Sequence, residues 1–280
     1  LTNNVSVRSL VLSGADLDGS GSLTVRSNMT WSAGVLRGAG VTTIAPGATL
    51  TVSGASDKDL RRRLDSYGTV AWTAGRILGH DIPTINNFAG ALFDTQTDAT
   101  LFESGDGTTK TFNNFGTVRK SASTGTSTWN GTFVNSGTVN VQTGTLNPAG
   151  TATLNTSSYT GTGQFKLTGG TLAGTLTIAV GADVNFASGT LSGTGTIVGT
   201  MSWTGGTMGL GGTTTIATNG VLLISGATEK DLRPAPDRRI DRALTVDLLP
   251  HRAAGDILHG DEEIVTELPE VVDLGDVLVL

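Results

Sequence analysis

The sequence has no cysteine, and only 5% of its 280 residues are aromatic and 15% charged. The absence of cysteine excludes disulfides and thiolate sites. No apolar run approaches the roughly 20 residues of a membrane-spanning helix, so no membrane span is expected in this chain. The N-terminus has no signal-peptide pattern. Residue 1 is Leu rather than Met, which predicts a processed or partial chain, part of a longer polypeptide.

Positive charge is also in short supply. The formal net charge is −6, and residues 1–232 hold 13 acidic and 13 basic side chains, whereas residues 233–280 hold 11 acidic and 5 basic ones. The main part of the chain therefore has no basic excess to neutralise a phosphate backbone. This argues against nucleic acid as a partner.

Glycine, serine and threonine are abundant instead. There are 40 glycines, and Val, Ile, Leu and Phe recur between them at short, regular intervals. Short alternating runs bounded by Gly, Ser, Asn and Asp are typical of strands and tight turns. No helical periodicity occurs in 1–232, so this part is predicted to be all-β.

One long stretch occurs twice. Residues 31–60 read WSAGVLRGAGVTTIAPGATLTVSGASDKDL, and residues 203–232 read WTGGTMGLGGTTTIATNGVLLISGATEKDL. They align without a gap at an offset of 172, and 14 of the 30 positions are identical. Such self-similarity indicates an array of one small structural unit.

A shorter pattern, N-x-G-T-V, sets the period. It begins at Asn114 and Asn135, and variants begin at Ser66 and Asn87. The glycines of these units are Gly68, Gly90, Gly116 and Gly137. A parallel β-solenoid with about 21–22 residues per coil has this spacing, and the offset between the long copies then corresponds to about eight coils. Stacked asparagine corners are expected to bond along the stack, and eleven or so coils at ~4.8 Å would form a rod roughly 50 Å long.

The composition changes at about residue 233. Residues 233–280 contain only 3 of the 40 glycines but 4 of the 7 prolines. We therefore divide the chain into a solenoid domain, 1–232, and an acidic C-terminal segment, 233–280, that departs from the pattern. Two interpretations stay open for this segment: a cap over the open end of the solenoid, or a poorly ordered terminus.

Several of these stretches resemble a known class of repeats: W-[ST]-[AG]-G followed by TIAPGATLTVSG and KDL, then NNFGTVRKSASTGTSTW, FVNSGTVNVQTGTL and LSGTGTI. They resemble the repeat regions of filamentous-haemagglutinin-like and autotransporter-like bacterial surface adhesins. The resemblance covers about 1–232. It implies a right-handed parallel β-helix that is exposed at the cell surface or secreted. It implies no catalytic residue and no cofactor.

A charged cluster closes each copy of the long repeat: Asp57, Lys58 and Asp59 in the first, and Glu229, Lys230 and Asp231 in the second. Two carboxylates two residues apart suit acid–base chemistry or cation binding. The favoured interpretation is a loop in which the lysine pairs with the acids around it. Arg61, Arg62 and Arg63 extend the first cluster and suit contact with an anionic glycan.

Other candidate sites are less complete. The sequence DLDGSGSL gives Asp16, Asp18 and Ser20 the spacing of a calcium loop, but position 12 is Ser27 rather than Glu, which favours a polar corner. Trp31, Trp72 and Trp203 share one repeat position and are expected to pack rather than to bind sugars. The three histidines are scattered, so no metal site is predicted, and G-x-S-x-G and H-E-x-x-H motifs are absent.

These observations lead to three functional hypotheses. The first is a non-enzymatic secreted or cell-surface solenoid that acts as a stalk or adhesive module, with glycans or a host or neighbouring cell surface as partners. The second is a polysaccharide-active β-helix enzyme, a lyase or hydrolase, which needs several charged residues converging on one face. The third is an ice-binding solenoid, which needs a flat, regular face of Thr-x-Thr strands.

Overall fold

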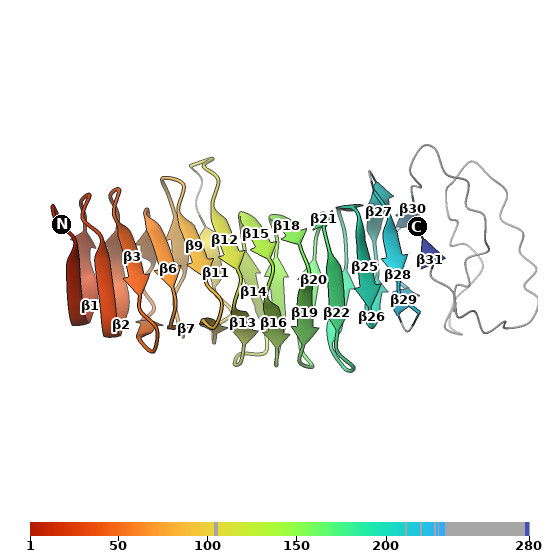
Figure 1. The fold of residues 1–280 in the computed structure, drawn as a ribbon, viewed down its shortest axis with the longest axis horizontal. Helices are drawn as coiled ribbons and strands as arrows, with labels where there is room; N and C mark the ends of the chain where they lie inside the picture. Colours follow the sequence, from red (N-terminus) through yellow and green to blue (C-terminus); the bar gives the residue numbers. More distant parts are fainter. Residues whose placement is uncertain are drawn as a thin grey trace, which may run out of the picture.

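The protein is a rod built from one parallel β-solenoid of about 11 turns (Figure 1). The computed structural model describes residues 1–103, 106–210, 212–218, 220–226, 228, 230–232 and 278–279. Within these residues every element is a strand and none is a helix. The predicted all-β parallel solenoid is therefore confirmed.

Each turn has three sides, which we call faces A, B and C. The first two turns, β1 (Val5–Leu17) and β2 (Leu23–Leu36), run continuously around all three faces. From β3 onward each strand pairs with the strand three further along the chain, so every third strand lies on the same face.

The strands on each face are as follows. Face A contains β3 (Val41–Ile44), β6 (Arg63–Ser66), β9 (Thr84–Asn87), β12 (Thr111–Asn114), β15 (Thr132–Asn135), β18 (Thr151–Leu154), β21 (Gly170–Leu172), β24 (Thr190–Gly193), β27 (Gly206–Leu210) and β30 (Lys230–Leu232). Face B contains β4 (Thr49–Val52), β7 (Thr69–Trp72), β10 (Leu92–Thr95), β13 (Thr117–Lys120), β16 (Thr138–Val141), β19 (Ser157–Thr160), β22 (Thr175–Ile178), β25 (Gly195–Val198) and β28 (Thr214–Ile216). Face C contains β5 (Lys58–Leu60), β8 (Ile77–Gly79), β11 (Thr100–Glu103), β14 (Thr126–Trp129), β17 (Thr145–Pro148), β20 (Gln164–Leu167), β23 (Asp183–Phe186), β26 (Thr200–Trp203) and β29 (Val221–Ile224).

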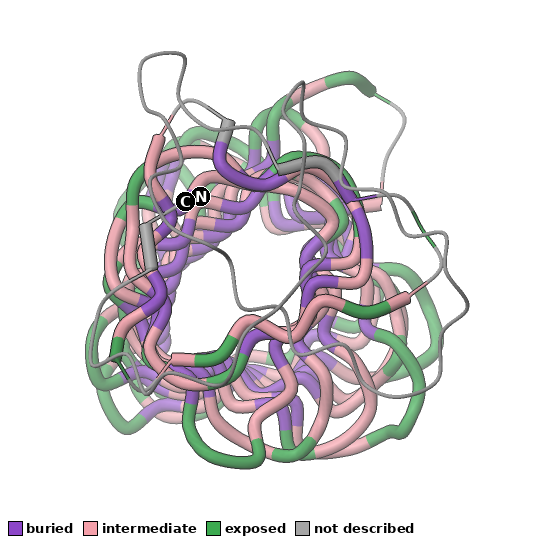
Figure 2. Tube along the Cα trace, turned by 90° about the vertical axis from the view of Figure 1, so that its right-hand side faces the viewer, coloured by how far each residue is buried: buried purple, intermediate pink, exposed green. Residues whose placement is uncertain are grey.

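Strict alternation within these short strands produces the core. A typical strand, β4, reads Thr-Leu-Thr-Val and buries its second and fourth residues, because successive side chains of a strand point to opposite sides. Figure 2, seen along the rod, shows the buried residues lining the inside of the tube and the exposed ones at its corners. Aromatic rings pack against each other in the middle of the rod, where the centroids of Phe112 and Trp129 are 4.6 Å apart.

The corner from face A to face B, corner AB, contains the predicted asparagine ladder. The amide nitrogen of Asn87 donates to the side-chain oxygen of Asn114 (2.8 Å), and Asn114 donates in turn to Asn135 (2.7 Å). All three side chains are fully buried. The ladder ends where Asn135 donates to the hydroxyl of Tyr159 (3.1 Å). The amide nitrogen of each asparagine thus donates to a side chain in the next turn, along the rod axis, instead of to water.

Glycine allows the corners to be tight. Gly47 has φ of 76° in the turn Ala45–Pro46–Gly47–Ala48, where the nitrogen of Ala48 donates to the carbonyl of Ala45 (2.9 Å). Proline followed by a glycine with positive φ matches a type II turn. Because corners range from such turns to longer loops, the length of a coil varies: a short coil separates the register partners Leu191 and Met208, and a longer one separates Ile85 and Phe112.

The two copies of the long repeat do not lie on the same face, as a spacing of whole coils would require. Val41–Ile44 of the first copy forms β3 on face A, whereas its counterpart Thr214–Ile216 forms β28 on face B. From β3 to β28 the chain advances 25 strands, which is eight turns of three strands and one strand more. The interpretation of the repeat offset as about eight coils therefore omits one third of a turn.

Only a small part of the C-terminal segment is described. Strand β31 (Leu278–Val279) pairs antiparallel with β28 at the end of the rod. Residues 233–277 and 280 lie outside the described residues, so the division at residue 232 and the two interpretations of the segment stay predictions. No helix among the described residues has the length and apolarity needed to cross a membrane.

Candidate functional site

The lysine of the first charged cluster points into the solenoid. Lys58 is fully buried, and its ammonium donates to the carbonyls of Gly54 (2.6 Å) and Ala74 (2.9 Å). Burial lowers the pKa of Lys58, although the nearby Asp57 opposes this shift. Lys230, its counterpart, is also buried and donates to the carbonyls of Gly226 (2.9 Å) and Thr228 (2.8 Å). Each lysine therefore stabilises a corner from within.

The neighbouring acids face outward and pair with other residues. Asp57 accepts two bonds from Arg76 (2.9 and 2.6 Å), and these bonds lower the pKa of the Asp57 carboxyl, partly offset by burial. Asp59 accepts a bond from Arg61 (2.7 Å) and lies 2.8 Å from Nδ1 of His80. The acids are paired, but the prediction of a loop with the lysine between them is wrong: Lys58 and Asp59 lie in strand β5 (Lys58–Leu60), and the partners of the acids are arginines and a histidine.

The three consecutive arginines have three different environments. Arg62 is 3% exposed, and its guanidinium donates to the carbonyls of Gly40 (2.7 Å), Arg37 (3.2 Å) and Gly21 (2.9 Å) in the two preceding turns. Burial lowers its pKa. Arg61 pairs with Asp59 (2.6 Å). The exposed Arg63 pairs with Asp65 (3.0 Å).

Two of the residues proposed as surface contacts, Lys58 and Arg62, are thus not available to a ligand at the surface, because carbonyl groups inside the corners surround their charges. Lys230 is 8% exposed and belongs with them. Glu229 lies outside the described residues, and Asp231 lies in β30, where only its backbone is described.

Sequence reasoning missed the contact between His80 and Asp59. The two residues lie one turn apart on the rod, so the coil period itself would have identified the pair. A carboxylate on Nδ1 orients an imidazole as in many active sites. However, no hydroxyl group of the described chain hydrogen-bonds to His80, and Arg61 occupies the same carboxylate. The described residues also contain no group of three or more metal-ligating side chains.

The other candidate residues have structural roles. Asp16 and Asp18 both pair with Arg37 (3.3 and 3.1 Å), as expected for a polar corner. Trp31, Trp72 and Trp203 are fully buried, and each indole nitrogen donates to a backbone carbonyl two or three positions further on. The prediction that these tryptophans pack rather than bind sugars is confirmed.

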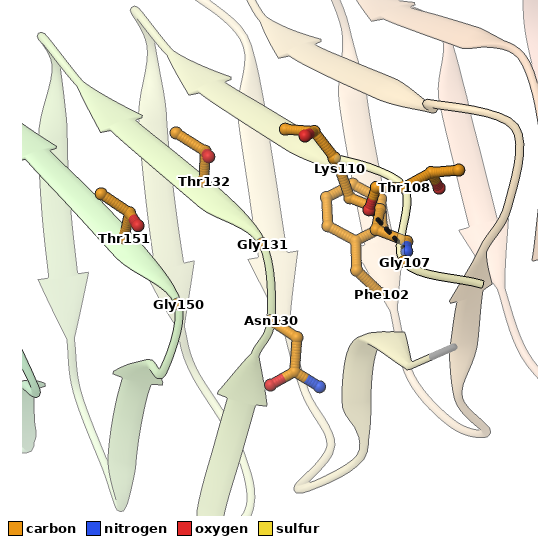
Figure 3. Close-up of a pocket in the computed structure, with 10 residues that line it drawn as sticks. Phe102, Gly107, Thr108, Lys110, Asn130, Gly131, Thr132, Gly150 and Thr151 are labelled. Carbon is orange, nitrogen blue, oxygen red and sulfur yellow. Dashed lines mark hydrogen bonds between the residues drawn. The ribbon is translucent and has the colours of Figure 1, made fainter. Parts of the chain in front are cut away.

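An open hollow of about 390 Å³ lies at the corner between faces C and A. Figure 3 shows Thr132 and Thr151 on adjacent strands beside the glycine corners Gly131 and Gly150. A Cβ on Gly150 would lie 1.9 Å from the carbonyl oxygen of Gly131, so this wall is bare backbone. Lys110 donates to the carbonyl of Thr108 (2.7 Å) and to Asp106. No carboxylate is among the residues that line the hollow.

Corner AB presents a second feature on the outside of the rod. Tyr67, Phe88 and Phe115 each follow a buried residue of the N-x-G-T-V units and form a column that we call the aromatic ladder. Tyr67 and Phe88 stack at 4.3 Å with planes 4° apart, and Phe88 and Phe115 at 6.2 Å and 19°. Tyr67 is 42% and Phe115 45% exposed. The repeat pattern could have revealed this column, since the residue after each corner Ser or Asn is aromatic in three successive units.

A smaller hollow, of about 220 Å³, lies immediately beyond the ladder on the same corner. It is lined by small, uncharged residues: Ser136, Gly137, Thr138, Thr156, Ser157, Ser158 and Thr177. Ser136 and Gly137 occupy, one turn later, the places of Phe115 and Gly116. The last ring of the aromatic ladder therefore lies one turn before two of the residues that line this hollow.

Comparison with known proteins adds no family or relative: no family model, no curated protein and no solved structure matches the chain.

Proposed function

We propose that this protein is a non-enzymatic, secreted or cell-surface solenoid that serves as a stalk and adhesive module. The observation that carries the proposal is the unbroken parallel pairing of strands on all three faces through about 11 turns. The backbones of these strands pair along the rod, as required to hold side chains at fixed positions over a long distance.

The surface supports this proposal because several of its charges pair between turns. Arg119 and Asp94 form two bonds (3.0 and 2.7 Å) across adjacent turns of face B, and Arg76 bridges Asp57 and Glu103 (2.6 and 2.8 Å). Such pairs between turns hold the coils in register. A function as stalk needs this property and needs no deep cleft.

The enzyme alternative needs convergent carboxylates with room for a sugar chain between them. The acids of the charged cluster are instead bound by cations, as Asp59 is by Arg61 and Asp57 by Arg76. The ice-binding alternative needs a flat array of Thr-x-Thr strands. Thr84, Thr111, Thr132 and Thr151 do stack in register, but the second outward row beside them reads Asn86, Asn113, Val134 and Thr153.

Three measurements on the full chain test the proposal together. We expect the purified protein to bind to cells or to an array of glycans, to appear as an unbranched rod in electron micrographs, and to release no sugar fragments from a panel of polysaccharides. Release of reducing ends or unsaturated products by the protein would establish the enzyme alternative. Failure to bind any cell or glycan surface would remove the adhesive part of the proposal and leave the stalk.

A further inference from the structure

The end of the aromatic ladder is an unusual surface in this molecule. Phe115 stacks on Phe88 with one face, and the corresponding position one turn further on is Ser136. A hydroxymethyl group is too small to cover a phenyl ring. The ring is accordingly 45% exposed, although burying it would be favourable. A flat apolar face therefore points along the rod toward the small hollow.

The hollow offers hydrogen-bonding groups that the fold leaves unused. Thr138, Ser158 and Thr177 lie on consecutive strands of face B in matching register. Their hydroxyl groups make no hydrogen bond within the described part of the chain, whereas Ser136 already accepts one from Asn155 (2.7 Å). Each free hydroxyl can both donate and accept. The rod thus presents a row of unsatisfied hydroxyls next to an unpaired ring.

Gly137, which lines the hollow, packs its backbone closely on the preceding turn. A Cβ at this position would lie 2.2 Å from the carbonyl oxygen of Gly116 in the preceding turn. The close approach of the two backbones excludes any side chain. Between Phe115 and Thr138 this corner therefore contributes backbone at Gly137 and only the small side chain of Ser136.

The chemistry of the surroundings selects the ligand. None of the residues that line the hollow is charged, so a charged ligand would gain no partner there. Its volume of about 220 Å³ is smaller than the ~300–1,000 Å³ of pockets for drug-sized molecules. A pyranose ring has one face of C–H groups, which stacks on an aromatic ring, and an edge of hydroxyls.

We propose that Phe115 and the hydroxyl-lined hollow bind one pyranose unit of a neutral glycan. The sugar stacks its C–H face on Phe115 and exchanges hydrogen bonds with Thr138 and Ser158. This site rests on the proposed adhesive function and gives it a ligand class. It differs from the anionic glycan suggested by the run Arg61–Arg63, whose charges are all engaged within the protein.

The test is calorimetric titration of the full chain with cellohexaose and mannohexaose as neutral probes and hexagalacturonate as an anionic one. We expect at least one neutral probe to bind, and to bind more tightly than the anionic one. Phe115→Leu keeps an apolar side chain but loses the flat ring, and should weaken binding roughly three- to tenfold, by about the contribution of one aromatic contact. Thr138→Val preserves the shape and should weaken binding a few-fold.

The matched control is Tyr67→Leu. It removes the ring at the other end of the same ladder, and so the same kind of stacking, but Tyr67 lies three turns from Ser136, whereas Phe115 lies one turn from it. This variant should bind the sugar within about twofold of the wild type, since Phe115 alone of the three rings lies in the turn next to Ser136 and Gly137, which line the hollow. Should Phe115→Leu fail to fold, Phe115→Trp, which retains a flat ring and should retain binding, and Thr138→Val carry the test.

Several results would overturn the site. These are tighter binding of the anionic probe, unchanged binding by Phe115→Leu and Thr138→Val, or an equal loss in Tyr67→Leu. No binding of any oligosaccharide, combined with adhesion to cells, would overturn the site and leave the proposed function standing. If sugars bind and none of the variants changes the affinity, the adhesive contact lies elsewhere on the rod.

Discussion

The two copies of the long repeat share 14 of their 30 residues and a similar local structure, but they lie on different faces of the rod. Trp31 is on face B and Trp203 on face C, and each indole donates to a nearby carbonyl, of Gly34 (3.3 Å) and Gly205 (3.1 Å). Lys58 and Lys230 both turn inward and bind the carbonyl of the glycine four positions earlier.

This comparison shows that the three faces are interchangeable for the chain. One strand with its corner, and not one full coil, is the structural unit, since 25 strands separate the copies. Each unit needs only an inward pair of apolar residues and a corner that glycine permits. What differs between faces is the outer surface, where neighbouring turns supply different partners.

The largest expected effect tests whether the buried halves of the copies are equivalent. Trp31→Ala and Trp203→Ala each remove a fully buried indole from the core. Each should lower the free energy of unfolding by about 3–5 kcal/mol, the range for large core truncations. Denaturant titration measures both losses, and hydrogen exchange shows which turns open. If the losses of stability in the two variants differed by more than about 2 kcal/mol, the width of that range, the buried halves of the two copies would not be equivalent.

The next effect concerns the buried lysine. Lys58→Met fills the same space but leaves the carbonyls of Gly54 and Ala74 without their donor. We expect a loss of about 2–4 kcal/mol, since each bond involves a charged group. Because burial lowers the pKa of Lys58, the folded protein loses this proton at a lower pH than the unfolded chain does. The unfolded chain therefore binds more protons than the folded protein as the pH approaches 10.5, and the stability of the wild type should rise there relative to that of the variant. Thermal unfolding between pH 7 and 10.5 measures both. A variant as stable as the wild type would show that the carbonyls find water instead.

Much of this architecture could be predicted from the sequence. The period of the N-x-G-T-V units predicts the stacking of Asn87, Asn114 and Asn135, because identical corners meet in a solenoid. The inward direction of Lys58 was also accessible, since alternation within a strand places it on the side of Leu60. The pair of Asp59 and His80 could have been found by comparing residues that lie one coil apart in the sequence.

Other features were not accessible from the sequence. The face on which a strand lies depends on the summed lengths of all preceding corners, and these vary. Phe102 illustrates a local irregularity: it has φ of 63° and is buried, and its bulge shifts Glu103 to pair in register with Leu78. No glycine in the sequence marks the position of the positive φ or of the bulge. The exposed face of Phe115 depends on the ring–ring geometry of three turns.

The turns between the two copies provide a third comparison, because here the core contains a tyrosine hydroxyl, that of Tyr159. Burial raises the pKa of Tyr159 to about 12, although bonds from Ser157 and Asn135 oppose the shift. The unfolded chain loses this proton at about pH 10, so the stability is complete below pH 10 and falls between pH 10 and 12. The loss should reach about 2–3 kcal/mol at pH 12.

Tyr159→Phe checks this origin. The variant loses the acceptor for Asn135 and should be less stable at pH 7 by about 1 kcal/mol. Its stability should change less than that of the wild type as the pH rises from 9.5 to 11.5, which urea titrations at each pH would record. An identical alkaline decline in both proteins would assign it to other groups, for example the lysines.

The smallest effects lie on the outer surface of the first copy, where the two acids of the charged cluster can be compared. Asp59→Asn removes a charge that is 12% exposed and that contacts both Arg61 and His80, and should cost about 1 kcal/mol. Asp57→Asn removes a 37%-exposed partner of Arg76, and exposed pairs contribute little. Arg76 bonding lowers the pKa of Asp57, so any contribution is present at neutral pH and disappears in acid. The ranking should hold in 0.5 M salt, which screens the Asp57 pair more. A larger loss for Asp57→Asn would mean that the outer ion pairs, rather than the inward-facing residues that the copies share, keep these turns in register.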